Sequence, residues 1–198
     1  MRDLVIATFN PKKGKEMQTI LGELLVDTRL LTLQSFPDAI EPEETGTTYE
    51  ENAGIKALSA AEASGLPSIS DDAGLEIDFL EGAPGVYSKR FLGEEMPFEQ
   101  KNQRILEMMK DVPDEGRGAR FRCYIALASG ESLMSFHAIC EGRIARQISG
   151  GGGFGYDPIF YLPELGCTMA DLSAEEKHKV SHRGKVLRAF AAFWNSVG

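Results

Sequence analysis

The chain has 198 residues, of which 42% are hydrophobic and 26% are charged, and its formal net charge is −9. This length and composition are typical of a globular protein with a self-sufficient core, and we expect residues 1–198 to form a single domain. The acidic balance disfavours a nucleic-acid partner, whose phosphates require a basic surface. It does not exclude a single nucleotide, which needs only a local group of lysines and arginines.

The three cysteines, Cys123, Cys140 and Cys167, match neither a disulfide framework nor the spacing of a metal site. We therefore expect a reducing, cytoplasmic location. The N-terminal segment becomes polar too soon for a signal peptide, and no apolar run reaches the length of a membrane span. No membrane partner is expected.

The first apolar run, at residues 4–7, leads into a polar segment with three lysines at residues 8–15. An amphipathic helix is predicted next, because apolar residues recur on one helical face: Met17, Ile20, Leu21, Leu24 and Leu25. This order of strand, loop and helix directs backbone N–H groups and the positive end of the helix dipole toward an anion. The Walker pattern GxxxxGKS/T is absent. A phosphate-binding loop and an ordinary solvated helix start both fit the pattern.

A second strand (28–33) and an acidic loop (37–46) precede an Ala-rich helix. Thr48 and Glu51 have the T-x-x-E spacing of a capping box, which predicts where this helix begins. Glu51 therefore has a structural role available, which disfavours it as a catalytic group. Packing alone gives no reason for Lys56, one turn further along.

Two adjacent carboxylates, Asp71 and Asp72, come just before a segment with the alternation of a half-buried strand, in which Leu75, Ile77 and Phe79 are the apolar positions. On a short strand followed by a sharp turn, the two side chains would point in different directions. One could then hold Mg2+ or accept a proton from water while hydrogen bonds fix the other. The alternative is an Asx-type turn on the surface.

The second half of the chain is predicted to be antiparallel and linked by hairpins. A helix at 97–109 is followed by strands at 121–127, 133–140 and 142–148. Four glycines at 150–153 then introduce an aromatic segment.

That segment, residues 154–160, is too aromatic for a linker, and we interpret this region as a flexible hinge or a close-approach loop that presents an aromatic platform. A second capping box, Ser173 to Glu176, starts a helix that carries Lys177. The polar residues 181–185 are expected to interrupt this helix before a last one, which runs through Trp194.

Taken in order, these segments closely resemble the inosine/xanthosine triphosphate pyrophosphatases, a Ham1-like family. The matching stretches are Thr8 to Lys13, Glu43 to Gly46, Tyr49 to Ala53, Asp71 to Leu75, Gly82 to Gly85, Phe154 to Pro158 and Ser181 to Gly184. They span nearly the whole chain, and their joint occurrence is much more specific than any one of them.

The resemblance implies an α/β fold with a long mixed β-sheet, flanking helices and two lobes around a central nucleotide cleft, usually in a homodimer. It implies a hydrolase that cleaves the purine nucleotides ITP, dITP, XTP and dXTP to the monophosphate and pyrophosphate. It also implies Mg2+ as the cofactor. Such an enzyme would cleanse the nucleotide pool.

Residue by residue, the resemblance makes Asp72 the proton acceptor and a metal ligand and makes Glu43 the second acidic ligand, with Asp71 and Glu44 beside them. The residues implied to bind the substrate are Thr8, Phe9, Asn10, Pro11, Lys12, Lys13, Lys56, Ala73, Phe154, Gly155, Tyr156, Asp157, Lys177, His182 and Arg183. Two of these depart from the family's pattern. Phe9 replaces a frequent Gly and crowds the phosphate loop, and Ala73 replaces a common Ser.

The mechanism expected from these assignments is in-line attack of water on the α-phosphorus, with pyrophosphate as the leaving group. The base would stack on Phe154 while donors from His182, Arg183 or the nearby backbone meet its 6-oxo group. Two other functions stay open: a pyrophosphatase for modified pyrimidine or methylated nucleotides, and a nucleotide sensor without turnover. The carboxylates Glu43 and Asp72 argue against the sensor, and a purely structural module would leave the charged clusters unexplained.

Overall fold

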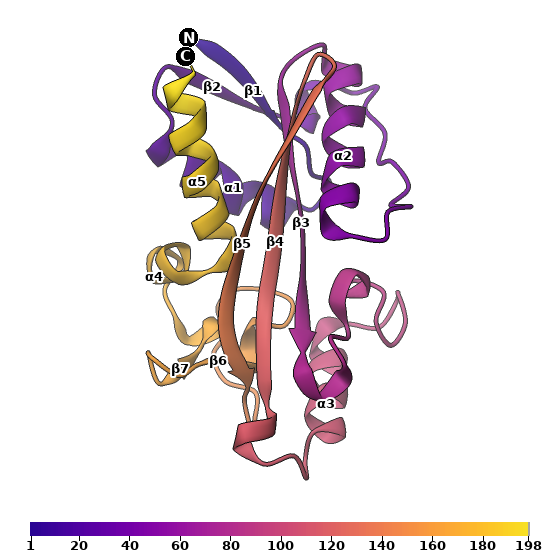
Figure 1. Ribbon diagram of the computed structural model, residues 1–198, viewed down its shortest axis with the longest axis vertical. Coiled ribbons are helices and arrows are strands. Elements are labelled where there is room, and N and C mark those ends of the chain that lie inside the picture. Colours follow the sequence, from indigo (N-terminus) through magenta and orange to yellow (C-terminus); the bar gives the residue numbers. More distant parts are fainter. Residues whose placement is uncertain (198) are drawn as a thin grey trace. The chain divides into compact units, whose positions relative to one another are not determined.

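The computed structural model describes residues 1–197, and over this range seven strands form one mixed sheet in the order β2-β1-β3-β4-β5-β6-β7. The strands are β1 Arg2–Ile6, β2 Thr28–Thr32, β3 Ser68–Ile77, β4 Gly118–Ser129, β5 Ser132–Ile144, β6 Phe160–Leu162 and β7 Cys167–Thr168. The helices are α1 Pro11–Leu24, α2 Tyr49–Ser64, α3 Phe98–Met108, α4 Ala174–Val180 and α5 His182–Ser196 (Figure 1). The predicted α/β class and mixed sheet are confirmed.

The chain folds into two compact units, each assembled from segments that are far apart in the sequence. The first unit comprises Met1–Asp72, Cys123–Ala138 and Arg183–Gly198, and the second comprises Ala73–Arg122 and Ile139–His182. Both units contain parts of β3, β4 and β5. In the part of the chain that is described, no helix is both long enough and apolar enough to cross a membrane.

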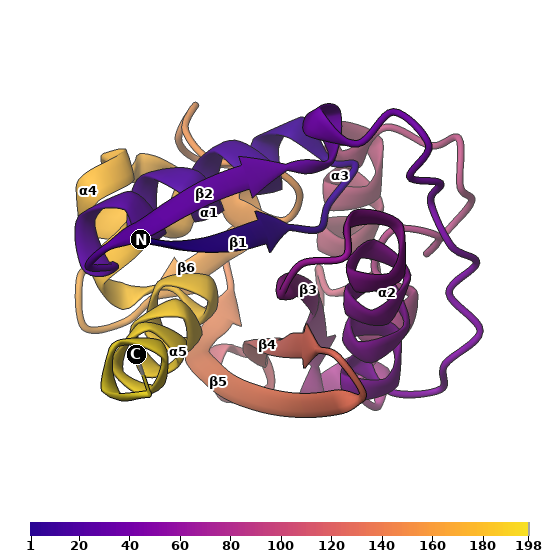
Figure 2. The same ribbon diagram turned by 90° about the horizontal axis from the view of Figure 1, so that it is seen from above.

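The first unit contains the parallel part of the sheet. β1 pairs in parallel with β2, and with β3 through Val5↔Ser68 and Ile6↔Ile69. Both views show α2 on one side of β3, with α1 and α5 on the other (Figures 1 and 2). The Ala-rich helix α2 approaches the sheet closely because its buried face is small, with Ala53 and Ala57 packed in one cluster with alanines of β4.

The second unit is antiparallel, as predicted. β6 pairs antiparallel with both β5 and β7. Its core contains Leu75 and Ile77 of β3, Ile105 of α3 and Phe160 of β6. The buried Arg117 donates hydrogen bonds to four main-chain carbonyls, those of Met109, Val112, Ile144 and Ala145.

One predicted break between elements is wrong, and another is shorter than predicted. Residues 133–148 do not form two strands, because β5 runs without interruption to Ile144. Gly142 is needed for packing: a Cβ there would lie 2.6 Å from the Phe160 ring and from the Tyr161 carbonyl oxygen, so only glycine lets β6 pass this close. Likewise, Ser181 alone separates α4 from α5, and His182 and Arg183 already belong to the first turn of α5.

Candidate active site

The polar segment after β1 is a capped helix start. Asn10 is the N-cap of α1, and its side-chain oxygen accepts hydrogen bonds from the backbone N–H groups of Lys12 at 3.0 Å and Lys13 at 3.2 Å. The backbone N–H of Asn10 in turn donates to the Thr8 hydroxyl. Pro11 occupies the first helical turn, and Phe9 is exposed. The predicted strand, loop and helix are thus confirmed, and Lys12 and Lys13 lie at the positive end of the α1 dipole.

Asp71 and Asp72 lie inside β3, so their predicted position on a strand is confirmed, but the sharp turn expected after them is absent because β3 continues to Ile77. The pairing of β1 with β3 ends at Ile6↔Ile69, so the two aspartates extend beyond the carboxyl end of β1. In open α/β sheets this edge is the usual place for ligands. Because consecutive side chains of a strand point to opposite faces, the two carboxylates reach different helices.

Asp71 is part of a buried ion-pair chain on the side of α1 and α5. Arg183 donates to its Oδ2 from Nε at 3.1 Å and from Nη2 at 2.7 Å, and Lys13 Nζ lies 3.3 Å from the same oxygen. Arg183 also donates from Nη1 to Glu16 of α1 at 2.8 Å. Burial alone would raise the pKa of Asp71, but the charges of Lys13, Arg183 and Lys56 outweigh it and hold the pKa well below its usual range. These charges favour the ionised form of Asp71.

Asp72 is bonded on the side of α2. Lys56 Nζ lies 2.9 Å from Asp72 Oδ1 and 2.9 Å from a carboxylate oxygen of Glu44. Burial raises the pKa of Asp72, although Lys56 and Lys13 oppose it. Lys56 is also largely buried, which would lower its pKa, but Asp72, Asp71 and Glu44 reverse the direction and keep it charged. Lys56, which packing did not explain, thus bridges the two acidic groups.

The structure favours Glu44 over Glu43 as the second acidic group. Glu43 is exposed, whereas Glu44 is half-buried and contacts Lys56. The two residues are adjacent in an irregular segment, where no periodicity in the sequence tells which side chain turns inward.

The acidic groups at this edge can supply only part of the coordination shell of Mg2+. Across residues 1–197, no three His, Cys, Asp or Glu side chains are gathered as a ready metal cluster. Mg2+, however, commonly binds through one or two carboxylates and completes its shell with waters and substrate phosphates. Within the described chain, the buried Oδ1 of Asp71 has no hydrogen-bond partner, and a buried carboxylate oxygen requires one. Together with Asp72, it supplies two acidic groups of the kind that Mg2+ prefers.

The other predicted site residues lie in the second unit, around a buried ion pair. Lys177 Nζ is 2.8 Å from an Asp157 oxygen and 4.5 Å from the centre of the Phe154 ring. The same Asp157 oxygen accepts the backbone N–H of Phe154, and a Cβ at Gly153 would collide with this carboxylate. The close-approach loop and its aromatic side chain are therefore confirmed as structural features.

The other predicted site residues of the second unit contact neighbouring residues of the protein. The Tyr156 hydroxyl donates to the Ser88 carbonyl at 2.8 Å, and the Gly155 carbonyl accepts from the Asn102 side chain at 3.0 Å. His182 is buried and stacks on Phe121, with ring centres 4.6 Å apart. Ala73, half-buried in β3, is the first residue of this unit.

Glu16 is the main residue that the sequence predictions missed. It is one turn before Ile20 on the face of α1 that also buries Met17 and Leu21. An acidic side chain within an apolar helical stripe indicates a buried charge that requires a partner. This signal predicts the pairing but does not identify Arg183 as the partner.

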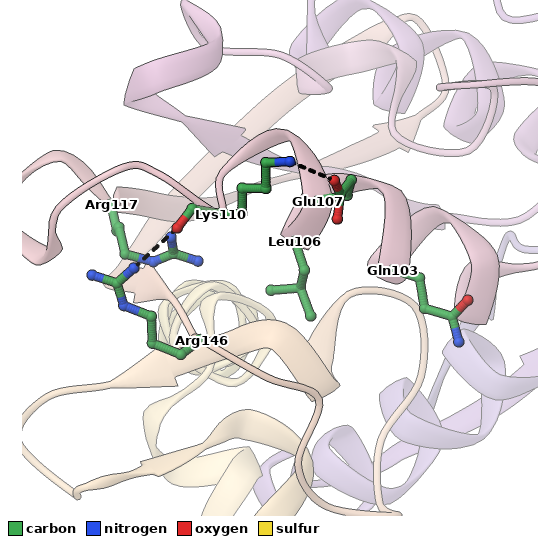
Figure 3. Close-up of a pocket in the computed structure, with 6 residues that line it drawn as sticks. All are labelled: Gln103, Leu106, Glu107, Lys110, Arg117 and Arg146. Carbon is green, nitrogen blue, oxygen red and sulfur yellow. Dashed lines mark hydrogen bonds and ion pairs between the residues drawn. The ribbon is translucent and has the colours of Figure 1, made fainter.

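A separate pocket of about 350 Å3 in the second unit is lined by Gln103, Leu106, Glu107, Lys110, Arg117 and Arg146 (Figure 3). Its cations already have internal partners. Lys110 pairs with Glu107, Arg146 pairs with Asp114, and Arg117 is bonded to main-chain carbonyls. None of the predicted site residues lines it.

The fold and the cluster at the edge of β3 define an α/β protein with carboxylates and lysines at the carboxyl end of a parallel strand. The Ham1 family profile matches residues 4–193, and the chain belongs to the Ham1 family. Its relatives include the "dITP/XTP pyrophosphatase" of Photorhabdus laumondii, 46% identical over 95% of both chains, and that of Escherichia coli O157:H7, 44% identical over the same shares. The solved HAM1 protein of Coxiella burnetii has a TM-score of 0.89 and 39% identity over 99% of this chain and 100% of its own.

Proposed function

We propose that this chain is a Mg2+-dependent pyrophosphatase that converts ITP, dITP, XTP and dXTP to the monophosphate and pyrophosphate. The observation that carries this proposal is the pairing of Asp72 and Glu44 with Lys56 at the carboxyl end of β1, beside the capped N-terminus of α1. The names of the relatives support the same substrates and reaction.

The first unit would bind the triphosphate and the metal. The side chains of Lys12 and Lys13, at the positive end of the α1 dipole, would bind phosphate oxygens. Asp72 and Glu44 would hold Mg2+, with Asp71 at the same edge. When bound, Mg2+ would neutralise charge on the triphosphate and so favour attack at the α-phosphorus.

Asp72 would accept the proton from the attacking water. Its Oδ1 accepts a hydrogen bond from Lys56 Nζ at 2.9 Å. A pKa raised by burial makes the carboxylate a better proton acceptor than an ordinary aspartate, while Lys56 fixes its orientation. Lys56 would therefore act as a positioning residue for the acceptor.

Binding of the base is assigned to Phe154, Asp157, Lys177 and His182, with Arg183, on the family resemblance. The Phe154 ring would stack on the purine, and donors would meet its 6-oxo group, where adenine presents a donor of its own. A site that hydrogen-bonds the 6-oxo group would reject adenine nucleotides, because donor would face donor. A homodimer belongs to the proposal on the same ground, and light scattering in solution tests it. A cytoplasmic location belongs to the proposal because the cysteines match no disulfide framework.

The test is pyrophosphate release across a panel of ITP, XTP, dITP, GTP, ATP and modified pyrimidine triphosphates, with and without Mg2+. We expect one pyrophosphate per monophosphate, preference for ITP and XTP, and no turnover without a divalent cation. Preference for a modified pyrimidine or methylated nucleotide would identify the alternative pyrophosphatase. Tight binding of ITP without turnover would identify a sensor and overturn the proposal.

A further inference from the structure

Glu16, Arg183 and Asp71 form a buried chain of charges that the proposed reaction does not use. The residues are respectively 8%, 2% and 1% exposed, and Arg183 lies between the two carboxylates. One nitrogen of Arg183 donates to Glu16 at 2.8 Å, and its two other nitrogens donate to the same Asp71 oxygen at 3.1 and 2.7 Å. The three residues come from α1, α5 and β3.

The contacts on Asp71 are one-sided. Arg183 and Lys13 both approach Oδ2, whereas the buried Oδ1 has no hydrogen-bond partner among the described residues. A guanidinium that bonds one carboxylate oxygen from two nitrogens restrains rotation of the carboxylate. Oδ1 therefore keeps both a fixed direction and its negative charge at the edge where Asp72 lies.

We infer that Glu16 and Arg183 are positioning residues that hold Asp71 as a second fixed carboxylate for the divalent cation. This inference rests on the proposed function, because it concerns the same acidic edge. Arg183 fixes the orientation of Asp71, and Glu16 fixes Arg183 from the other side.

The charge balance gives Glu16 a second effect on the cation. The cluster holds four carboxylates, Glu16, Glu44, Asp71 and Asp72, against the three cations Lys13, Lys56 and Arg183. Among these seven groups one net negative charge remains, which attracts a divalent cation. Neutralising Glu16 removes one of these negative charges and one of the carboxylates that share the charge of Arg183, and both changes weaken cation binding.

The experiment titrates the purified full chain with Mn2+ alone and follows the free ion by electron paramagnetic resonance. Loss of a residue that orients a metal-binding carboxylate commonly weakens metal affinity by about tenfold or more. We therefore expect Arg183→Lys, which keeps the charge but loses the planar fork, to raise the Mn2+ dissociation constant by about tenfold. Glu16→Gln, one step further from the ion, should raise it less but measurably.

The matched control is Asp3→Asn, which removes the carboxylate of a more exposed pair in which Arg29 also donates from two nitrogens, one to each oxygen of Asp3. This variant should bind Mn2+ as the unmodified chain does. Near-ultraviolet circular dichroism identifies the variants that fold, and either of the two suffices for the test. Folded variants with Mn2+ affinity within twofold of the unmodified chain would overturn the inference, as would an unmodified chain that binds no Mn2+. Failure of the proposed function is distinct, because it appears as absent pyrophosphate release from ITP by the unmodified chain.

Discussion

Asp71 and Asp72 are neighbours in β3, yet ion pairs hold them to different helices: Arg183 of α5 bonds Asp71 at 2.7 Å, and Lys56 of α2 bonds Asp72 at 2.9 Å. Opposite orientation of consecutive side chains in a strand produces this division. The environments also move the two pKa values in opposite directions. The pKa of Asp71 is held low by Lys13, Arg183 and Lys56 despite its burial, and the pKa of Asp72 is raised by burial. Paired carboxylates with divergent pKa values are typical of a site that divides charge stabilisation from proton transfer.

The first prediction separates these two roles by isosteric substitution. Asp72→Asn should lower pyrophosphate release from ITP by about 10²-fold or more, because it removes the proton acceptor. It should leave the fold largely intact, since Lys56 keeps Glu44 as a partner. Asp71→Asn should instead lower the free energy of unfolding by about 3 kcal/mol, because it leaves the buried charge of Arg183 short of one partner. Urea denaturation and a turnover assay on both variants measure the contrast. Near-normal ITP hydrolysis by Asp72→Asn would exclude it as the acceptor.

The second prediction distinguishes the two adjacent glutamates of the acidic loop. Glu44→Gln should raise the Mg2+ concentration needed for half-maximal activity, because Glu44 contacts Lys56 beside Asp72. Glu43→Gln is the matched control, since Glu43 is exposed and the same change should have little effect. Mg2+ titrations of both variants at saturating ITP decide between them. A larger effect at Glu43 would restore the assignment that the sequence resemblance suggested.

Lys13 tests the phosphate-binding role of the α1 N-terminus. Its ammonium lies 3.3 Å from Asp71 and is still one-fifth exposed, so it remains accessible to a ligand. Lys13→Ala should weaken binding of ITP more than binding of IMP, because the charge that it meets lies on the β- or γ-phosphate. Calorimetric titration with both nucleotides provides the comparison, and Lys15→Ala, an exposed change on the same helix, is the control. An equal loss of affinity for ITP and IMP would place Lys13 at the α-phosphate or outside the site.

The cap at the start of α2, the helix that carries Lys56, contributes to the stability of the chain. The Thr48 side chain accepts the backbone N–H of Glu51, and Glu51 accepts in return from Thr48 and Thr47. Thr48→Ala should cost about 1 kcal/mol of unfolding free energy. The pKa of Glu51 is lowered, first by the backbone hydrogen bond from Thr47, so its contribution is present above the unfolded value of 4.5 and is lost as the pH falls through the folded value.

The pH dependence provides the check on this cap. Glu51→Ala should destabilise the chain at pH 7, and the difference from the unmodified chain should shrink as the pH is lowered below 4.5. Urea denaturation across this range measures it. A difference that stays constant with pH would mean that Glu51 acts through packing and not through its charge.

Local features of the sequence predicted the local parts of the structure. Both capping boxes, at Thr48 and Ser173, are present as expected, because an N-cap depends on residues three apart. The strand β1, the polar loop after it and the helix α1 were likewise predicted from local patterns in the sequence.

What the sequence did not predict depends on contacts between distant segments. The Glu16–Arg183 pair joins residues 167 positions apart, and no local pattern identifies the partner. The unbroken β5 depends on the approach of β6 to Gly142, so the glycine signals tight packing where a break was expected. A sharp turn was expected directly after Asp71 and Asp72, whereas β3 continues through the pair to Ile77, and ion pairs to three helices hold the two carboxylates.

The last prediction concerns base choice, for which the sequence proposed His182 and Arg183. His182 is held rigidly by its stack on Phe121, as a residue that selects among bases by hydrogen bonding requires. If the pair donates to the 6-oxo group, His182→Ala and Arg183→Ala should lower kcat/KM for ITP and XTP more than for ATP. One lost hydrogen bond of about 1–3 kcal/mol would narrow the ITP-to-ATP ratio by about tenfold or more.

The ITP-to-ATP ratio of kcat/KM tests this prediction. Absolute activity does not, because Arg183 also bonds Asp71, and its loss is expected to slow the hydrolysis of every nucleotide. His178→Ala is the matched control: a half-buried histidine of α4 to which no role in binding is assigned, so its loss should leave the ratio unchanged. A ratio that stays unchanged in both His182→Ala and Arg183→Ala would remove the pair from base recognition. Arg183 would then keep the role given by its contacts with Asp71 and Glu16, and the donor to the 6-oxo group would have to be sought among the backbone N–H groups nearby.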